Sequence, residues 1–189
     1  GKIKAIYLHH DGYIDHAGKV LKYHYNNEIA ANALVELGDL SFIDEKLEPE
    51  KGQEHSFRKR AEGVTVAYHR DRGGKKRIIT LNSIDDFEAE MGNYSYAYLF
   101  DPEEDGGWSV YNKKHAMWEP LSLVIDDKTG EVYTGKGGVK TSGSVFDGIT
   151  SLFFGIKEVA TENVFTGKGG EKKNGSCPSC KRKLQEDKL

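Results

Sequence analysis

The chain has 189 residues, of which 37% are hydrophobic, and it carries a formal net charge of −3. This size and composition fit one domain of ordinary size with an appendage, or two small units, and they supply enough apolar side chains for a core. The longest apolar run, residues 145–156, contains Asp147 and is shorter than the roughly 20 residues that span a bilayer. No membrane segment and no leader peptide are therefore expected, and the sequence predicts a soluble protein of the cytoplasm.

The first predicted elements are a strand and a helix. Residues 3–8 have the apolar pattern of a strand, and the segment that follows has Asp-Gly turn chemistry. Asp15 is the expected N-cap of a helix that continues to Tyr25.

A second helix is predicted for residues 28–37, whose apolar residues form one stripe at helical spacing. Asn27 stands at its N-cap position, and Gly38 stands where a left-handed C-terminal cap belongs. The charged segment 45–60, which contains Pro49, is expected to be a long exposed loop.

Hairpins dominate the predicted structure after this loop. Each consists of two β-rich runs joined by a Gly-containing turn: residues 64–68 with 77–81, 94–100 with 108–111, and 121–125 with 131–133. Between the first two hairpins, Ser83 is expected to cap a short helix that ends near Gly92. The pattern predicts an α+β fold: a mostly antiparallel sheet of hairpins with two N-terminal helices packed on it, and a Gly/Lys/Cys-rich tail.

The last third of the chain contains an internal repeat. Residues 131–144 and 163–176 align without gaps at an offset of 32 and are identical at nine of fourteen positions. The apolar stretch between the copies, residues 145–160, has a helix-like pattern. The expected organisation is an α+β core in residues 1–118, a hairpin and repeat region in residues 119–176, and a basic tail in residues 177–189.

The end of the chain is basic and contains both cysteines. Residues 165–189 hold seven Lys/Arg and three Asp/Glu, a net charge of +4, so this segment either contacts an anionic partner or stays solvated. The C-P-S-C spacing of Cys177 and Cys180 allows two thiolates to bind one zinc ion, and the remaining ligands would come from histidines or from a second copy of the chain. Unligated thiols and a redox pair are the alternatives.

Two charged clusters follow predicted strands. The first contains His9, His10, Asp11, Asp15 and His16, with His24 about two helical turns further on. The second is the run His69-Arg70-Asp71-Arg72. One interpretation is a divalent-metal hydrolase site formed by the metal-ligating residues of the two clusters, which are His9, His10, Asp11, His69 and Asp71. A second is that they are ordinary turn, cap and packing residues.

The arginines of the second cluster suggest a third interpretation. Arginine side chains suit phosphate, and the tyrosines beside the clusters can stack on a base. The predicted ligand-binding residues are Asp11, Tyr13, Tyr68, Arg70, Asp71 and Arg72.

Three stretches resemble a group of small proteins encoded in bacteriophage genomes. They are I6-Y-L-H-H-D-G-Y, A33-L-V-E-L-G-D-L40 and A67-Y-H-R-D-R-G73, and the resemblance covers about residues 3–111. The group's pattern has Trp where this chain has His10, and the repeat and the Cys pair are additions to it. The resemblance implies a phage accessory protein that acts in the cytoplasm of the host cell, and such proteins often bind and block a host or defence component.

Three functions are consistent with these observations. The first is a non-enzymatic accessory protein that binds a host protein or a small phosphorylated ligand. The second is a metal-dependent phosphoesterase or nuclease that uses the His/Asp cluster. The third is a nucleic-acid-associated protein that docks through its basic Cys-containing tail, and each of the three is compatible with a homo-oligomer.

Overall fold

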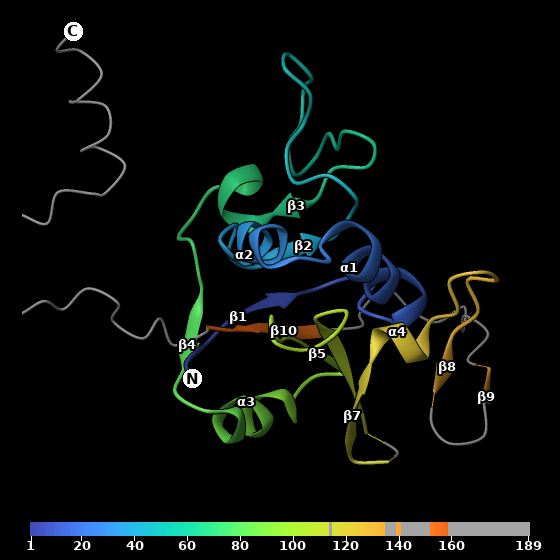
Figure 1. The fold of residues 1–189 in the computed structure, drawn as a ribbon. Coiled ribbons are helices and arrows are strands. Elements are labelled where there is room, and N and C mark those ends of the chain that lie inside the picture. The colour runs from blue at the N-terminus through green and yellow to red at the C-terminus, as the bar shows by residue number, and fades with distance from the viewer. Residues whose placement is uncertain (114, 135–138, 141–151, 159–189) are drawn as a thin grey trace, which may run out of the picture.

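The computed structural model describes residues 1–113, 115–134, 139–140 and 152–158 (Figure 1). Its elements in chain order are β1 (Ile3–Leu8), η1 (Ile14–Gly18), α1 (Lys19–His24), α2 (Glu28–Val35), β2 (Leu40–Phe42), β3 (Val66–Ala67), η2 (Tyr68–Arg72), β4 (Ile79–Leu81), α3 (Ile84–Met91), β5 (Tyr96–Phe100), β6 (Trp108–Asn112), β7 (Met117–Pro120), α4 (Leu121–Val124), β8 (Tyr133–Thr134), β9 (Val139–Lys140) and β10 (Leu152–Lys157). The expected α+β class is confirmed. No helix within the described ranges is long and apolar enough to cross a membrane.

A mixed sheet of eight strands forms the centre of the molecule. Its order is β3-β2-β1-β10-β5-β6-β7, and β4 pairs with the first half of β1. β1 runs parallel to β2 and antiparallel to β10, whereas β10 runs parallel to β5. The sheet is therefore not the simple series of hairpins that the sequence predicts.

Helices cover both faces of this sheet. On one face, α1 and α2 pack through Leu21 and Leu34 on a core that includes Leu8, Tyr98 and Phe154. On the other face, α3 packs through Phe87 on Ile3 and Leu99 of a second, smaller core. Figure 1 shows α1 and α2 on one side of β1 and β10, and α3 on the opposite side.

Several local predictions are confirmed. The side chain of Asn27 accepts a hydrogen bond from the amide of Ala30 at the start of α2, and Gly38 has φ 75° after its end. Ser83 Oγ accepts from the amide of Asp86 at the start of α3. The hairpin of β5 and β6 also forms, with Tyr98 opposite Val110.

The predicted N-cap of the first helix, Asp15, is wrong. The helix begins with a π-helical turn at Ile14, and Tyr13 occupies the N-cap position without a side-chain hydrogen bond. Asp15 lies in the first turn, where its carboxylate forms an ion pair of 2.6 Å with Lys19. A carboxylate near a helix N-terminus is favourable both as the N-cap and within the first turn. The residue type of Asp15 therefore did not distinguish these two positions.

Two predicted hairpins do not form. Residues 66–67 pair with β2 and residues 79–81 pair with β1, because the turn η2 ends β3 after two residues and turns the chain toward the buried β1. In the other predicted hairpin, of residues 121–125 with 131–133, residues 121–124 instead form α4, whose Leu121 and Val124 are buried in the core. Only the isolated bridge between Ile125 and Val132 remains of that hairpin.

The helix-like reading of residues 145–160 is also wrong where the structure describes them. Residues 152–157 form β10 between β1 and β5, with Phe154 and Ile156 buried. The core sheet therefore extends past the boundary expected at residue 118. In the first repeat copy, residues 133–134 pair with 139–140; the second copy, Cys177 and Cys180 lie outside the described residues.

Candidate functional site

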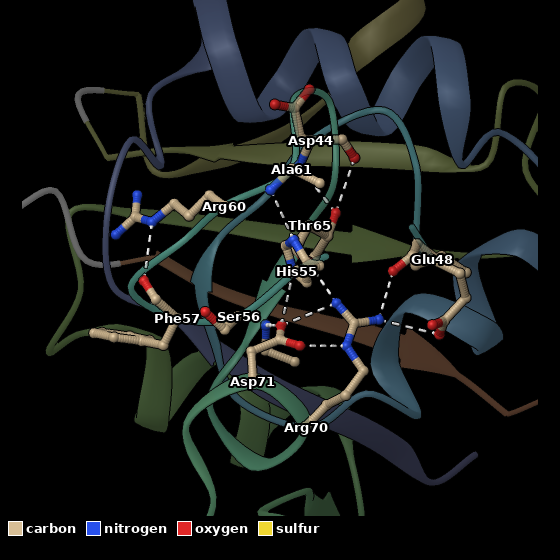
Figure 2. Close-up of polar contacts among 12 residues, drawn as sticks. Asp44, Glu48, His55, Ser56, Phe57, Arg60, Ala61, Thr65, Arg70 and Asp71 are labelled. Carbon is tan, nitrogen blue, oxygen red and sulfur yellow. Dashed lines mark hydrogen bonds and ion pairs between the residues drawn. The ribbon is translucent and has the colours of Figure 1, made fainter. Parts of the chain in front are cut away.

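The segment between β2 and β3 has no helix or strand of its own and is held in place by Arg70. The Arg70 guanidinium donates 2.7 and 2.9 Å hydrogen bonds to the carboxylate of Asp71. It also donates to the carbonyl oxygens of Leu47 (2.5 Å) and Thr65 (2.6 Å), and it lies 3.0 Å from Glu48 Oε1. Figure 2 shows the guanidinium between the two carboxylates. Because a guanidinium has five N–H donors, Arg70 has none left for a ligand.

Asp71 is the buried partner in this cluster. Its side chain is 3% exposed, and its Oδ2 also accepts a 2.7 Å hydrogen bond from the amide of Ala67. Burial raises the pKa of the Asp71 carboxyl, but the hydrogen bonds from Arg70 and Ala67 outweigh it, and the pKa is lowered overall. The same bonds raise the pKa of Arg70 against the opposing effect of its own burial. Both groups are charged throughout the neutral range.

His55 connects the middle of the segment to this ion pair. Its side chain is 2% exposed, and its Nδ1 accepts a 3.0 Å hydrogen bond from the amide of Ala61. Nδ1 is therefore unprotonated and the ring proton lies on Nε2, which is 3.3 Å from Asp71 Oδ2. This approach does not meet the geometry of a hydrogen bond, so it is a close polar contact between two buried side chains. The cluster is a structural clamp that anchors the segment, while residues 45–60 contain no helix or strand and are mostly exposed, as the sequence predicts.

The clamp places Phe57 on the surface between two arginines. The amide of Phe57 donates a 3.0 Å hydrogen bond to the carbonyl oxygen of Asp71. The Arg72 guanidinium lies 5.0 Å from the centre of the Phe57 ring and 6.0 Å from that of Tyr68. On the other side, the Arg60 guanidinium lies 5.9 Å from the Phe57 ring, and Figure 2 shows this side chain pointing away from Arg70.

These two arginines differ from Arg70 in their pairing. Neither Arg60 nor Arg72 has a carboxylate partner in the part of the chain that the structure describes, and Arg60 makes one long hydrogen bond, 3.5 Å to the carbonyl oxygen of Phe57. Their contacts are mainly with aromatic rings, which attract a cation through their π faces. Most of their N–H donors remain available. We call Phe57, Arg60, Tyr68 and Arg72 the Phe57 surface.

The loop after β1 meets this surface at His9. Its Nδ1 is 2.6 Å from the hydroxyl of Tyr68, and its ring stacks on that of His10 at 4.3 Å and 8°. Burial, with the charge of His10 as a smaller cause, lowers the pKa of His9, which favours the neutral ring. The amides of His9 and His10 donate to the carbonyl oxygens of Leu40 and Ser41, so the loop is fixed by continued pairing with β2.

Asp11 completes the turn with a backbone that is unusual for its residue type. Its φ is 57°, in the left-handed region that non-glycine residues rarely adopt. The next residue, Gly12, accepts a 3.0 Å hydrogen bond from the buried hydroxyl of Tyr98. Asp11 makes no described contact with Arg70 or Arg72, so the predicted polar pocket is only partly assembled.

Tyr13 and His69 are directed elsewhere. The Tyr13 ring lies 6.0 Å from that of His16, and His69 Nδ1 is 2.7 Å from the carbonyl oxygen of Gly74. Within the described ranges, His, Cys, Asp and Glu side chains nowhere form a group of three or more that could hold a metal ion. The metal set predicted from His9, His10, Asp11 and His69 is therefore not brought together.

Two members of the Phe57 surface were not identified from the sequence. Phe57 and Arg60 lie in the run His-Ser-Phe-Arg-Lys-Arg, where a single aromatic residue precedes three cations. That run was a usable signal, because an aromatic residue among arginines in a loop is typical of anion-binding surfaces. Its link to Tyr68 depends on the buried His55–Asp71 contact, which the sequence does not reveal.

The fold and the site together define an α+β protein with an exposed aromatic and cationic surface at one edge of its sheet. Comparison with known proteins finds no match to a family, to a curated protein or to a solved structure.

Proposed function

We propose that the protein is a non-enzymatic binding protein of the phage accessory type, and that its Phe57 surface binds a phosphorylated ligand. The observation that carries the proposal is the pair of arginines, Arg60 and Arg72, that lie on aromatic rings without a described carboxylate partner. Such guanidinium groups can donate to phosphate oxygens in a fork geometry. The rings of Phe57 and Tyr68 offer flat apolar surface for the rest of the ligand.

The electrostatic setting supports an anionic ligand. Residues 55–77 contain eight Lys/Arg and two Asp/Glu, a net charge of +6, in a chain whose net charge is −3. Asp71, one of the two acidic residues, is engaged by Arg70. Lys59, Lys76 and Arg77 form ion pairs with carboxylates outside the segment. The other cations, Arg58, Arg60, Arg72 and Lys75, have no ion pair among the described residues, and the positive potential is centred on them.

Of the two arginines predicted to contact phosphate, the proposal keeps Arg72 and leaves out Arg70. All five donors of Arg70 are used within the protein, whereas Arg72 is exposed and contacts only rings in the described structure. Tyr68 keeps its predicted role beside the ligand. Asp71 acts indirectly, because it fixes Arg70 and the backbone that carries Phe57.

The test is calorimetric titration of the full chain with each of the four common nucleoside triphosphates. We expect binding of at least one, and a loss of about 10- to 100-fold in affinity for Arg72→Gln, since a hydrogen bond to a charged group contributes about 1.5–3 kcal/mol. Arg58→Gln is the matched control: it removes the same charge from the segment before β3, and Arg58 has no described ring contact or ion pair. Equal losses for the two variants would contradict the proposal.

A further inference from the structure

We propose that the ligand of the Phe57 surface is single-stranded nucleic acid, bound with its bases on the aromatic rings and its phosphates on Arg60 and Arg72. The inference rests on the proposed function and names the ligand class. It depends on three observations: the rings continue beyond Phe57 on both sides, cations alternate with them, and the surface is held rigidly.

Rings continue from Tyr68 toward β1. The Tyr68 ring lies 5.8 Å from that of Phe57 and 6.3 Å from that of His9, which in turn stacks on His10. These residues belong to η2, to the segment before β3 and to the loop after β1, so three separate parts of the chain supply adjacent rings. All four side chains are partly exposed.

Rings also continue on the other side, beyond Arg60. Its guanidinium lies 6.0 Å from the ring of Phe42 at the end of β2, as well as 5.9 Å from that of Phe57. The Phe42 ring is 5.1 Å from that of His16 in η1. Along the surface, rings and guanidiniums thus alternate: Tyr68, Arg72, Phe57, Arg60, Phe42.

This alternation matches a polymer more closely than a single nucleotide. One mononucleotide needs one ring for its base and one cationic group for its phosphates, and either half of the surface would supply both. A single strand repeats base and phosphate, and proteins that bind it without sequence preference combine a cationic path with aromatic side chains on which successive bases stack. The cations of residues 55–77 that have no described ion pair favour a polyanion in the same way; they are Arg58, Arg60, Arg72 and Lys75.

The strand must be unpaired for this geometry to work. In a duplex the base faces are covered by their neighbours, and half-exposed side chains on a sheet edge cannot reach them. The phosphates of a duplex remain accessible to Arg60 and Arg72, so a duplex should bind only through charge. Contacts between bases and the aromatic rings therefore distinguish single-stranded from duplex nucleic acid.

The surface is fixed before the ligand arrives. The buried contact of His55 with Asp71 and the hydrogen bond from the amide of Phe57 to the carbonyl oxygen of Asp71 hold the loop. A loop backbone that is already ordered loses little entropy on binding. The surface is thus prepared to stack on bases at small cost.

The experiment measures fluorescence anisotropy of labelled ligands with the full chain under reducing conditions. The ligands are a 12-nucleotide oligothymidylate, the matching duplex and labelled thymidine triphosphate. We expect the single strand to bind at least tenfold more tightly than either the duplex or the triphosphate.

We expect Phe57→Leu and Arg72→Gln each to weaken single-strand binding by about 5- to 100-fold, the range for loss of stacking on one base. Arg72→Gln should also reduce the magnitude of the slope of log affinity against log salt by about 0.7, one phosphate contact of a single strand.

Every outcome of this experiment either supports or overturns the inference that the ligand is single-stranded nucleic acid. Arg58→Gln again serves as the charge-matched control, and thermal unfolding of every variant checks that it is folded. If Phe57→Leu is unfolded, it is replaced by Arg72→Lys, which keeps the charge and loses the planar group. Equal affinity for duplex and single strand, or losses no larger than that of Arg58→Gln, would overturn the inference. Equal affinity for the triphosphate and the oligonucleotide would overturn it while leaving the proposed function intact. Absence of binding to all three ligands would overturn the inference, and absence of binding to all four nucleoside triphosphates as well would remove the proposed function.

Discussion

Arg70 and Arg72 lie two residues apart in the same turn, and their surroundings differ completely. Arg70 reaches back under the loop and satisfies two carboxylates and two carbonyl oxygens. Arg72 points to the surface and lies over the rings of Phe57 and Tyr68. One residue type thus serves as a structural clamp in one position and as an available cation in the other, because burial decides which partners it meets.

A prediction at the residue scale concerns Asp71→Asn. We expect the variant to lose about 1.5–3 kcal/mol of unfolding free energy at pH 7, because the hydrogen bonds from Arg70 to Asp71 lose their negative acceptor while Glu48 remains as the second carboxylate partner. The folded pKa of Asp71 is below its ordinary value of 3.8, so its stabilisation is present above pH 3.8 and is lost as pH falls below it. The difference between wild type and variant should therefore shrink in acid, as measured by urea unfolding across pH.

The control for this prediction is Asp105→Asn, a charge removal at an exposed loop position. It should change stability by less than about 0.5 kcal/mol. A difference between wild type and Asp71→Asn that stays constant down to pH 2 would mean that the carboxylate does not stabilise the fold through its charge.

At the scale of elements, β10 and α3 depend on a close approach at Gly155. A Cβ added to Gly155 would lie 2.7 Å from Ile3 Cγ2 and 2.7 Å from Phe87 Cε2. Neither atom belongs to a long flexible side chain, and both residues are completely buried. Glycine at this position lets the Phe87 ring of α3 lie directly on the sheet.

The corresponding prediction is that Gly155→Ala destabilises the fold by about 1–3 kcal/mol, the usual cost of overpacking a core. Thermal or urea unfolding measures it. Phe87→Leu in the same chain should recover part of the loss, because the smaller side chain leaves room for the added methyl group. Gly92→Ala is the matched control: its added Cβ meets only the carbonyl oxygen of Ala89 at 3.6 Å, and it should be neutral or slightly stabilising.

At the scale of the whole molecule, the sheet joins distant parts of the chain. β10 lies between β1 and β5, and without it β5, β6 and β7 have no neighbour that connects them to β1 and β2. The buried side chains of Phe154 and Ile156 each contribute about 1.5–3 kcal/mol of apolar burial. The segment that carries β10 is therefore part of the core.

This arrangement predicts different outcomes for two truncations. A chain that ends after residue 158 keeps every strand of the eight-stranded sheet and should unfold cooperatively, with a urea midpoint close to that of the full chain. A chain that ends after residue 151 lacks β10 and should show no cooperative transition. Circular dichroism during urea titration measures both, and cooperative unfolding of the shorter chain would contradict the assigned topology.

The sequence by itself determined the local structure wherever short-range chemistry governs it. Strand β1, the capped helices α2 and α3, the turn at Gly38 and the hairpin of β5 and β6 follow from residues within a few positions of one another. Tyr68 and Arg72 share one turn, and the Arg72 guanidinium lies 6.0 Å from the centre of the Tyr68 ring.

Only the tertiary structure decided which strands pair and which charges are used. The apolar run that contains β10 fits a helix or a buried strand equally well by pattern, and the open position between β1 and β5 selects the strand. Likewise, Arg70 and Arg72 are indistinguishable along the chain, and the buried carboxylate of Asp71, fixed by Ala67 and facing His55, accounts for the difference. Both outcomes also depend on contacts between residues far apart in sequence, β10 with β1 and Arg70 with Leu47 and Glu48, which no local pattern encodes.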